Sequence, residues 1–184
     1  MAYIRIPDWN VVATAHQTWL PRARQILRKF GRVGRTDFHN VLVMRVENCQ
    51  EFLHQLGEAV QKEPDLLTAI SRVFPAQDAF DFFTPEEFDA KAREIALRWL
   101  PQLQGKSFHV RLHRRGLKGE LLSQPHEQVL DRALVEALAA TGSAGRIVFD
   151  DPDAILDIET VRNRAGMSLW TRADLQRYPF LRID

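Results

Sequence analysis

The sequence predicts an α+β fold, and three features of the pattern indicate it. Short apolar runs of strand length alternate with helical spacing in the first part of the chain. A helix with clear start signals follows, and the second half opens on a strand of alternating apolar and polar residues. The 184 residues, 45% hydrophobic and 27% charged, are enough for two small domains with buried cores.

The first predicted domain, residues 1–78, alternates between strand and helix patterns. A compact apolar run precedes a segment with helical spacing, and the pattern then repeats with a turn between two strands. In chain order we expect a strand within residues 9–15, a helix within 18–31 and two strands within 31–46. A helix within residues 49–64 and a strand within 69–76 follow. This β-α-β-β-α-β order predicts a ferredoxin-like domain.

A connecting helix is predicted in residues 79–104. Thr84 suits the N-cap, Pro85 suits the first helical position, and Glu87 completes a capping box. The apolar stripe of this helix continues until Pro101, where we expect the helix to end. We expect the helix to pack between the two domains.

The second predicted domain, residues 105–184, has the pattern of an α/β unit. Apolar and basic residues alternate from Phe108 to His113, which predicts a strand with one wet, basic face. Ser123 is expected to cap the following helix. Further strands are expected within residues 146–153 and 154–170, with a short helix in the tail.

The charge is segregated, although the formal net charge is only +1. The first basic run, Arg22–Arg35, holds six cations and no acid, and the second basic run, Lys106–Lys118, holds five cations and no acid. Acidic residues gather instead in Glu47–Asp65 and Asp78–Asp89. Because polyanion binding depends on where charge lies, the two basic runs are candidates for a nucleic-acid interface.

Catalytic, metal and cofactor motifs are not found in the sequence. The glycine-rich stretches lack the spacing of a phosphate-binding loop. Ser123, His126 and Asp131 fall on one predicted helix, where they cannot form a catalytic triad. The single cysteine, Cys49, is best interpreted as a small buried residue. We therefore expect a non-enzymatic protein with no catalytic residue, no metal and no cofactor.

The N-terminal residues do not have the pattern of a signal peptide, and no apolar run reaches the length of a membrane span. We expect a cytoplasmic protein that has no membrane partner.

Arginine guanidinium groups match phosphate oxygens with planar, paired donors. Few aromatic residues are interleaved with the cations, which favours recognition of RNA by shape and phosphate rather than by base stacking. The candidate RNA-binding residues come from the second basic run, from a predicted turn between the last strands and from the first basic run: Arg111, His113, Arg114, Arg115, Lys118, Arg162, Arg164, Arg24, Arg28 and Arg32.

The second half of the chain resembles a THUMP domain. The resemblance rests on the pattern Phe108-x-Val110-Arg111-x3-Arg115-Gly116, on Ser123 at a helix start, and on Ile147-Val148-x-Asp150-x-Pro152-Asp153-x-Ile155-x2-Ile158-Glu159. With the ferredoxin-like unit before it, the chain is similar to the standalone THUMP proteins related to the adaptor for tRNA cytidine N4-acetylation. The resemblance implies that both units bind tRNA, largely at the acceptor end, while a separate enzyme performs the chemistry.

The leading hypothesis is thus a non-catalytic tRNA-binding protein that presents its substrate to a tRNA-modifying enzyme such as an acetyltransferase. One alternative is a protein-interaction or regulatory module that docks through its acidic blocks. Another is a self-sufficient RNA-modifying enzyme with an unrecognised site.

Overall fold

The computed structural model of the chain describes residues 5–183. It contains two β-sheets accompanied by helices, which confirms the α+β class. The contacts divide the chain into two compact units, Met1–Gln77 with Leu175–Asp184 (the first unit) and Asp78–Asp174 (the second unit). This division differs from the expected one, because residues 79–104 belong to the second unit and the C-terminal residues belong to the first.

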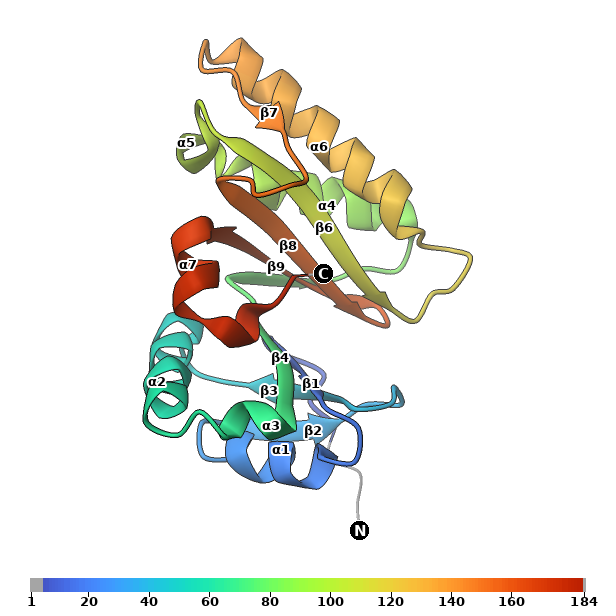
Figure 1. The fold of residues 1–184 in the computed structure, drawn as a ribbon. Helices are drawn as coiled ribbons and strands as arrows, with labels where there is room; N and C mark the ends of the chain where they lie inside the picture. The colour runs from blue at the N-terminus through green and yellow to red at the C-terminus, as the bar shows by residue number, and fades with distance from the viewer. Residues whose placement is uncertain (1–4, 184) are drawn as a thin grey trace. The chain divides into compact units, whose positions relative to one another are not determined.

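The first unit is built on a four-stranded antiparallel sheet with the order β2-β3-β1-β4 (Figure 1). Its elements follow the β-α-β-β-α-β order, with one short additional helix, α3, before the last strand. Their bounds are β1 (Val11–Ala15), α1 (Leu20–Leu27), β2 (Arg32–Arg35), β3 (Val41–Arg45), α2 (Cys49–Lys62), α3 (Leu66–Ala69) and β4 (Ile70–Pro75).

Local sequence explains how the helix α2 begins and what it buries. The side chain of Asn48 accepts a hydrogen bond from the Glu51 amide at 2.9 Å, which satisfies one of the unpaired donors of the first turn. The apolar residues of α2 recur at helical spacing and are buried: Phe52, Leu53, Leu56 and Val60.

The C-terminal segment packs within the first unit. It continues from α7 (Arg172–Arg177) into the 3₁₀-helix η1 (Pro179–Leu181), and Tyr178 between them is buried. A Cβ atom at Gly57 of α2 would lie 2.7 Å from the Tyr178 ring, so only glycine permits this close approach. The Tyr178 ring also contacts the Phe180 ring, with centroids 5.8 Å apart.

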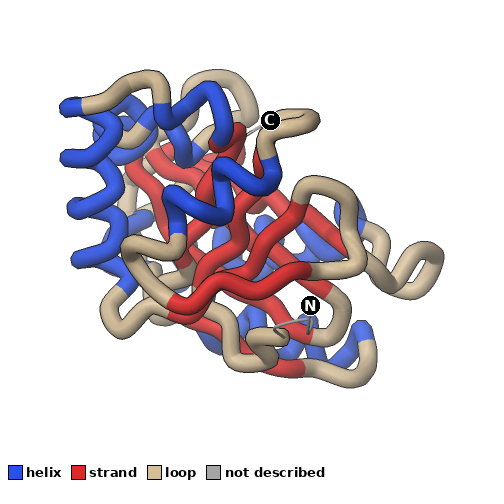
Figure 2. Tube along the Cα trace, turned by 90° about the horizontal axis from the view of Figure 1, so that it is seen from below, coloured by secondary structure: helices blue, strands red, loops and turns tan. Residues whose placement is uncertain are grey.

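The second unit is built on a five-stranded mixed sheet with the order β5-β9-β8-β6-β7; Figure 2 draws the strands in red. The strands β6, β7 and β8 are mutually parallel, while β9 runs antiparallel to β8 and to β5. The bounds are β5 (Asp78–Asp81), α4 (Pro85–Leu97), α5 (Leu100–Leu103), β6 (Ser107–Arg115), α6 (Ser123–Ala140), β7 (Arg146–Ile147), β8 (Ala154–Val161) and β9 (Arg164–Thr171).

The helix α4 begins where the sequence predicts but does not act as a separate connector. Thr84 Oγ1 accepts a hydrogen bond from the Glu87 amide at 3.1 Å, as in the predicted capping box. The apolar stripe of α4 lies in the core of the second unit, beside residues of α6. The helix ends at Leu97, and Pro101 lies in the first turn of the short helix α5.

The helix α6 has no side-chain cap. Leu122 occupies its N-cap position, so the expected capping role of Ser123 is wrong. The inner face of α6 packs on the sheet with the apolar side chains of β6 and β8: Leu130, Leu134, Leu138, Phe108, Val110, Leu112, Leu156 and Ile158. Within residues 5–183, none of the helices is long and apolar enough to cross a membrane.

Candidate nucleic-acid interface

The strand β6 has two chemically different faces. Phe108, Val110 and Leu112 are at most 4% exposed and belong to the core. The alternate residues, which begin with His109 and Arg111, lie on the opposite face of the sheet. The alternation predicted from the sequence is therefore present, but the basic face is less exposed than expected, because His109 is buried and the next basic side chains are half-buried.

Two acids of β8 lie beside the basic residues of β6. In the parallel register Asp157 is opposite Arg111 and Glu159 is opposite His113, and both acids are at most 1% exposed. His113 Nε2 lies 3.7 Å from Asp157 Oδ1, and Arg115 forms a close ion pair with Glu159. Part of the positive charge of the second basic run is therefore neutralised by the neighbouring strand.

Arg111 differs from these paired residues. Its Nε atom is buried and has no hydrogen-bond partner among the described residues. Among the same residues, the Arg111 guanidinium forms no ion pair, unlike that of Arg115. Because this guanidinium is not committed to an acid, its charge is available for a phosphate. Arg111 is the arginine of β6 best suited to bind an anion.

Two further cations of the second basic run are Arg114, near the end of β6, and Lys118, in the loop after it. Arg114 Nη1 donates to the carbonyl of Gly116, which holds that side chain close to the backbone. Gly116 has φ of +92°, a conformation that favours glycine and turns the chain away from the sheet. Lys118 is exposed on this loop.

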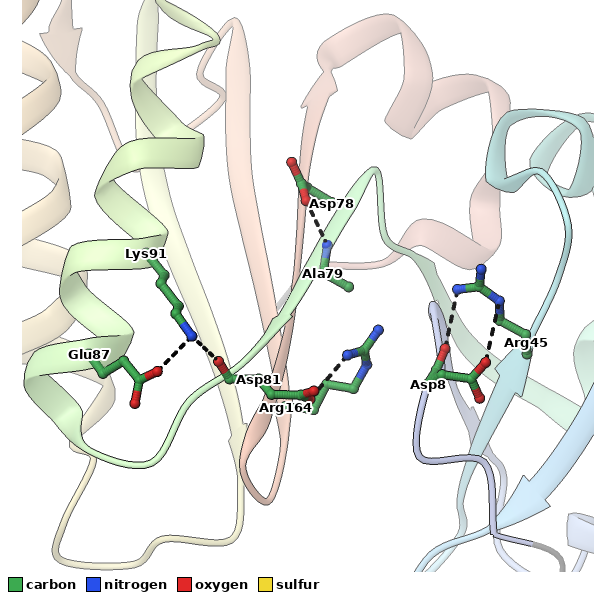
Figure 3. A network of polar contacts seen from close by, with 8 residues as sticks. All are labelled: Asp8, Arg45, Asp78, Ala79, Asp81, Glu87, Lys91 and Arg164. Carbon is green, nitrogen blue, oxygen red and sulfur yellow. Dashed lines mark hydrogen bonds and ion pairs between the residues drawn. The ribbon is translucent and has the colours of Figure 1, made fainter.

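The turn between β8 and β9 joins the end of β6. The Arg162 amide donates to the Arg115 carbonyl at 2.8 Å, which holds this turn beside the end of the second basic run's strand. Arg162 is exposed, with φ of +54°. Arg164 instead forms an ion pair with Asp81 at 3.0 Å, beside the Lys91 that contacts Asp81 and Glu87 (Figure 3).

In the first unit, Arg24 and Arg28 form a cluster with Arg35. Burial and the nearby charges of Arg28 and Arg35 lower the pKa of Arg24. Arg28 and Arg35 are exposed, whereas Arg24 is half-buried. In the first basic run, the charged neighbours of Arg24 are therefore other cations.

Arg32 lies elsewhere in the first unit. It is opposite Arg45 in the β2–β3 register, and both line an open cavity of about 700 Å³ at the start of α2. The Arg45 guanidinium lies 3.8 Å from the Asp8 carboxylate and donates to the Asp8 carbonyl at 3.2 Å (Figure 3). Because Glu47 and Glu51 also line the cavity, its charge is mixed.

Two carboxylates of α6 bind the free edge of β6. The strand β7 pairs only with the first two residues of β6, so the later amides on that edge lack a strand partner. Asp131 accepts from the Val110 amide at 2.9 Å, and Glu127 accepts from the Leu112 amide at 2.7 Å. Burial raises the pKa of Asp131 to about 6, with a smaller contribution from Glu127.

The groups considered for catalysis have separate partners. His126 Nδ1 lies 2.6 Å from Asp89 of α4, whereas Asp131 binds the β6 backbone, so no triad is assembled. Burial raises the pKa of Cys49 to about 11, which keeps this thiol protonated near neutral pH. In residues 5–183 no group of three or more His, Cys, Asp or Glu side chains could hold a metal ion.

Sequence reasoning missed the buried acids and one aromatic residue. Asp157 and Glu159 alternate with apolar residues in β8, a period-two signal that could have placed them on one face. Phe149 lies far from His109 in the sequence, yet their ring centroids are 5.2 Å apart. No local pattern indicates this contact, because it depends on how the chain returns after α6.

The comparisons with solved structures identify the fold. PH1313 from Pyrococcus horikoshii Ot3 is 12% identical with a TM-score of 0.54, and TrmN from Thermus thermophilus is 18% identical with a TM-score of 0.57. A 4-thiouridine synthetase in complex with RNA and ATP is 12% identical with a TM-score of 0.51. These alignments cover 88%, 86% and 87% of the chain, so each extends over both units.

The chain spans about half or less of these structures, namely 54%, 44% and 40% of their lengths. No family model and no curated protein sequence matches the chain. At these identities the likeness concerns the fold alone: the chain has an α+β fold that also occurs in a 4-thiouridine synthetase and in TrmN.

Proposed function

We propose that the chain is a THUMP-like, non-catalytic tRNA-binding protein that presents the acceptor end of tRNA to a tRNA-modifying enzyme, such as a cytidine N4-acetyltransferase. The observation that carries the proposal is the likeness, over 87% of the chain, to a 4-thiouridine synthetase whose structure contains RNA. The resemblance of the second half to THUMP domains supports the same function.

The second basic run provides chemistry suited to phosphate. Arg111 has an unsatisfied donor, Lys118 is exposed, and the Arg162 backbone is bonded to the end of β6. Arg115 is ion-paired with a buried acid and His113 lies beside another, so we assign them a supporting role that fixes the strand. A non-catalytic role agrees with the protonated Cys49 thiol and with the separate partners of His126 and Asp131.

A titration with unmodified tRNA at about 50 and 200 mM salt tests the RNA-binding part. Each phosphate contact contributes about 0.7 to 0.9 to the slope of log affinity against log salt. The double variant Arg111→Met, Lys118→Met is expected to flatten the slope by about 1.4 to 1.8, because two contacts are lost. The methionine at 111 keeps the packing of the side-chain stem.

The matched control is Arg132→Met, which removes an exposed cation from α6. It is expected to leave the slope unchanged. Tight tRNA binding with equal slopes for all three proteins would remove the second basic run from the interface. Absence of salt-sensitive binding by the parent protein would contradict the whole proposal.

The presenting role is tested by the modified nucleosides of tRNA. Cells that lack the gene should lose N4-acetylcytidine from tRNA, and the parent gene should restore it. The measurement is mass spectrometry of digested tRNA. If a different modified nucleoside is lost, the partner is another modifying enzyme and the presenting role stands. If no nucleoside changes, both the acetylation step and the presenting role are contradicted.

A further inference from the structure

Two phenylalanine side chains of the second unit are largely exposed, and they differ in whether another ring packs against them. Phe149 is 74% exposed and Phe83 is 83% exposed. A single exposed apolar residue is normal and indicates little by itself. The Phe149 ring, however, lies against the His109 ring at 5.2 Å with a tilt of 41°, whereas Phe83 has no such ring contact among the described residues.

His109 gives the Phe149 ring a fixed support. It is 8% exposed, and its Nδ1 atom lies 2.9 Å from the carbonyl of Val148, the residue before Phe149. The contact of His109 with the Val148 carbonyl and with the Phe149 ring therefore fixes the position of Phe149. A supported aromatic ring with an open face binds a nucleic-acid base by stacking, and little conformational freedom is lost when it does so.

The Phe149 ring lies at one end of the basic face of β6. Arg111 follows His109 on the same face, about 6.6 Å farther along the strand. Its guanidinium has the unsatisfied Nε donor described above. The residue that supports the ring and a cation without an ion pair are thus successive residues on one face of β6, which suits the neighbouring base and phosphate of a nucleotide.

The acids near Phe149 indicate which part of a nucleotide each end accepts. Asp151 and Asp153 are both bonded to Arg172, at 2.8 and 3.2 Å. Asp150 is exposed directly after Phe149 and would repel a phosphate there. The Phe149 end therefore suits an uncharged base, and the Arg111 end suits the phosphate.

We propose that Phe149, supported by His109, stacks on an unpaired base of the bound RNA while Arg111 contacts an adjacent phosphate. This inference rests on the proposed RNA-binding function and adds single-strand recognition to it. Bases within a duplex are already stacked on both sides, so the site would select an unpaired end or loop. It departs from the expectation that recognition rests on shape and phosphate rather than on base stacking.

The test uses one RNA duplex in two forms, blunt and with a four-nucleotide 3′ overhang that carries 2-aminopurine. Phe149→Ala is expected to weaken binding of the overhang form by roughly 5- to 150-fold and to leave the blunt form unchanged. Phe149→Trp should retain the affinity and the 2-aminopurine quenching. Phe83→Ala is the matched control and should bind both forms like the parent.

Two results would overturn the inference. One is unchanged affinity of Phe149→Ala for the overhang form, and the other is an equal loss for both forms. In either case salt-sensitive binding by the parent would still support the proposed function. If the parent binds neither form nor tRNA, the proposed function and this inference both fail.

Discussion

The two basic runs resemble each other in sequence and differ in their surroundings. In the first unit, Arg24 has the cations Arg28 and Arg35 as its main charged neighbours, and its pKa is lowered. In the second unit, Arg115 and His113 face the buried acids Glu159 and Asp157. A similar density of cations therefore places Arg24 among other cations in one unit and pairs Arg115 with a buried acid in the other.

This difference shows that local charge density does not measure the charge offered to a ligand. In the second basic run, the residues that remain available are the ones without an acid partner on β8. Arg111 and Lys118 are such residues, whereas Arg115 stabilises its own sheet. The two units therefore predict opposite responses when an arginine is replaced by an uncharged side chain.

The largest expected effect is that of Arg115→Met. The substitution leaves the fully buried Glu159 without its guanidinium partner, and breaking a buried ion pair in this way costs about 3–5 kcal/mol. The free energy of unfolding, measured by urea denaturation at pH 7.5, should fall by that amount. The double variant Arg115→Met, Glu159→Gln should recover most of the loss, because no buried charge is then unpaired.

The matched substitution in the first unit is Arg24→Met. Arg24 in α1 and Arg28 at its C-cap are like charges four residues apart, and such pairs destabilise a helix by roughly 0.2–0.5 kcal/mol. The variant is therefore expected to be slightly more stable than the parent, and the gain should shrink in 1 M salt. A loss as large as that of Arg115→Met would mean that the two units do not differ in the way described.

The α+β class and the alternation of β6 were predictable because they follow from hydrophobic period and start signals. The predicted Thr84 cap is present for the same reason: it depends only on residues within one turn. The pairing of Arg115 with Glu159 could not be predicted, since it depends on the register of two strands separated by a long helix. The support of Phe149 by His109 is non-local in the same sense.

A pH-dependent effect is expected for a buried acid that has a backbone partner rather than a cation. Asp131 is 8% exposed, accepts from the Val110 amide and has its pKa raised to about 6 from 3.8. Since the folded state favours the protonated form, Asp131 lowers stability as the pH rises from about 4 to about 6, by at most about 3 kcal/mol. Asp131→Asn keeps an oxygen acceptor for Val110 and removes the charge.

Urea denaturation of Asp131→Asn and the parent at pH 4, 5, 6 and 7.5 measures this contribution. The variant should match the parent at about pH 4 and exceed it increasingly up to about pH 6, with a constant difference above. Glu159→Gln provides the contrast, because it should destabilise at pH 7.5 by leaving Arg115 without its charged partner. If Asp131→Asn and Glu159→Gln both stabilise the protein, the Arg115 guanidinium does not compensate the charge of Glu159. The distinction between Glu159, which has a cation partner, and Asp131, which has none, would then fail.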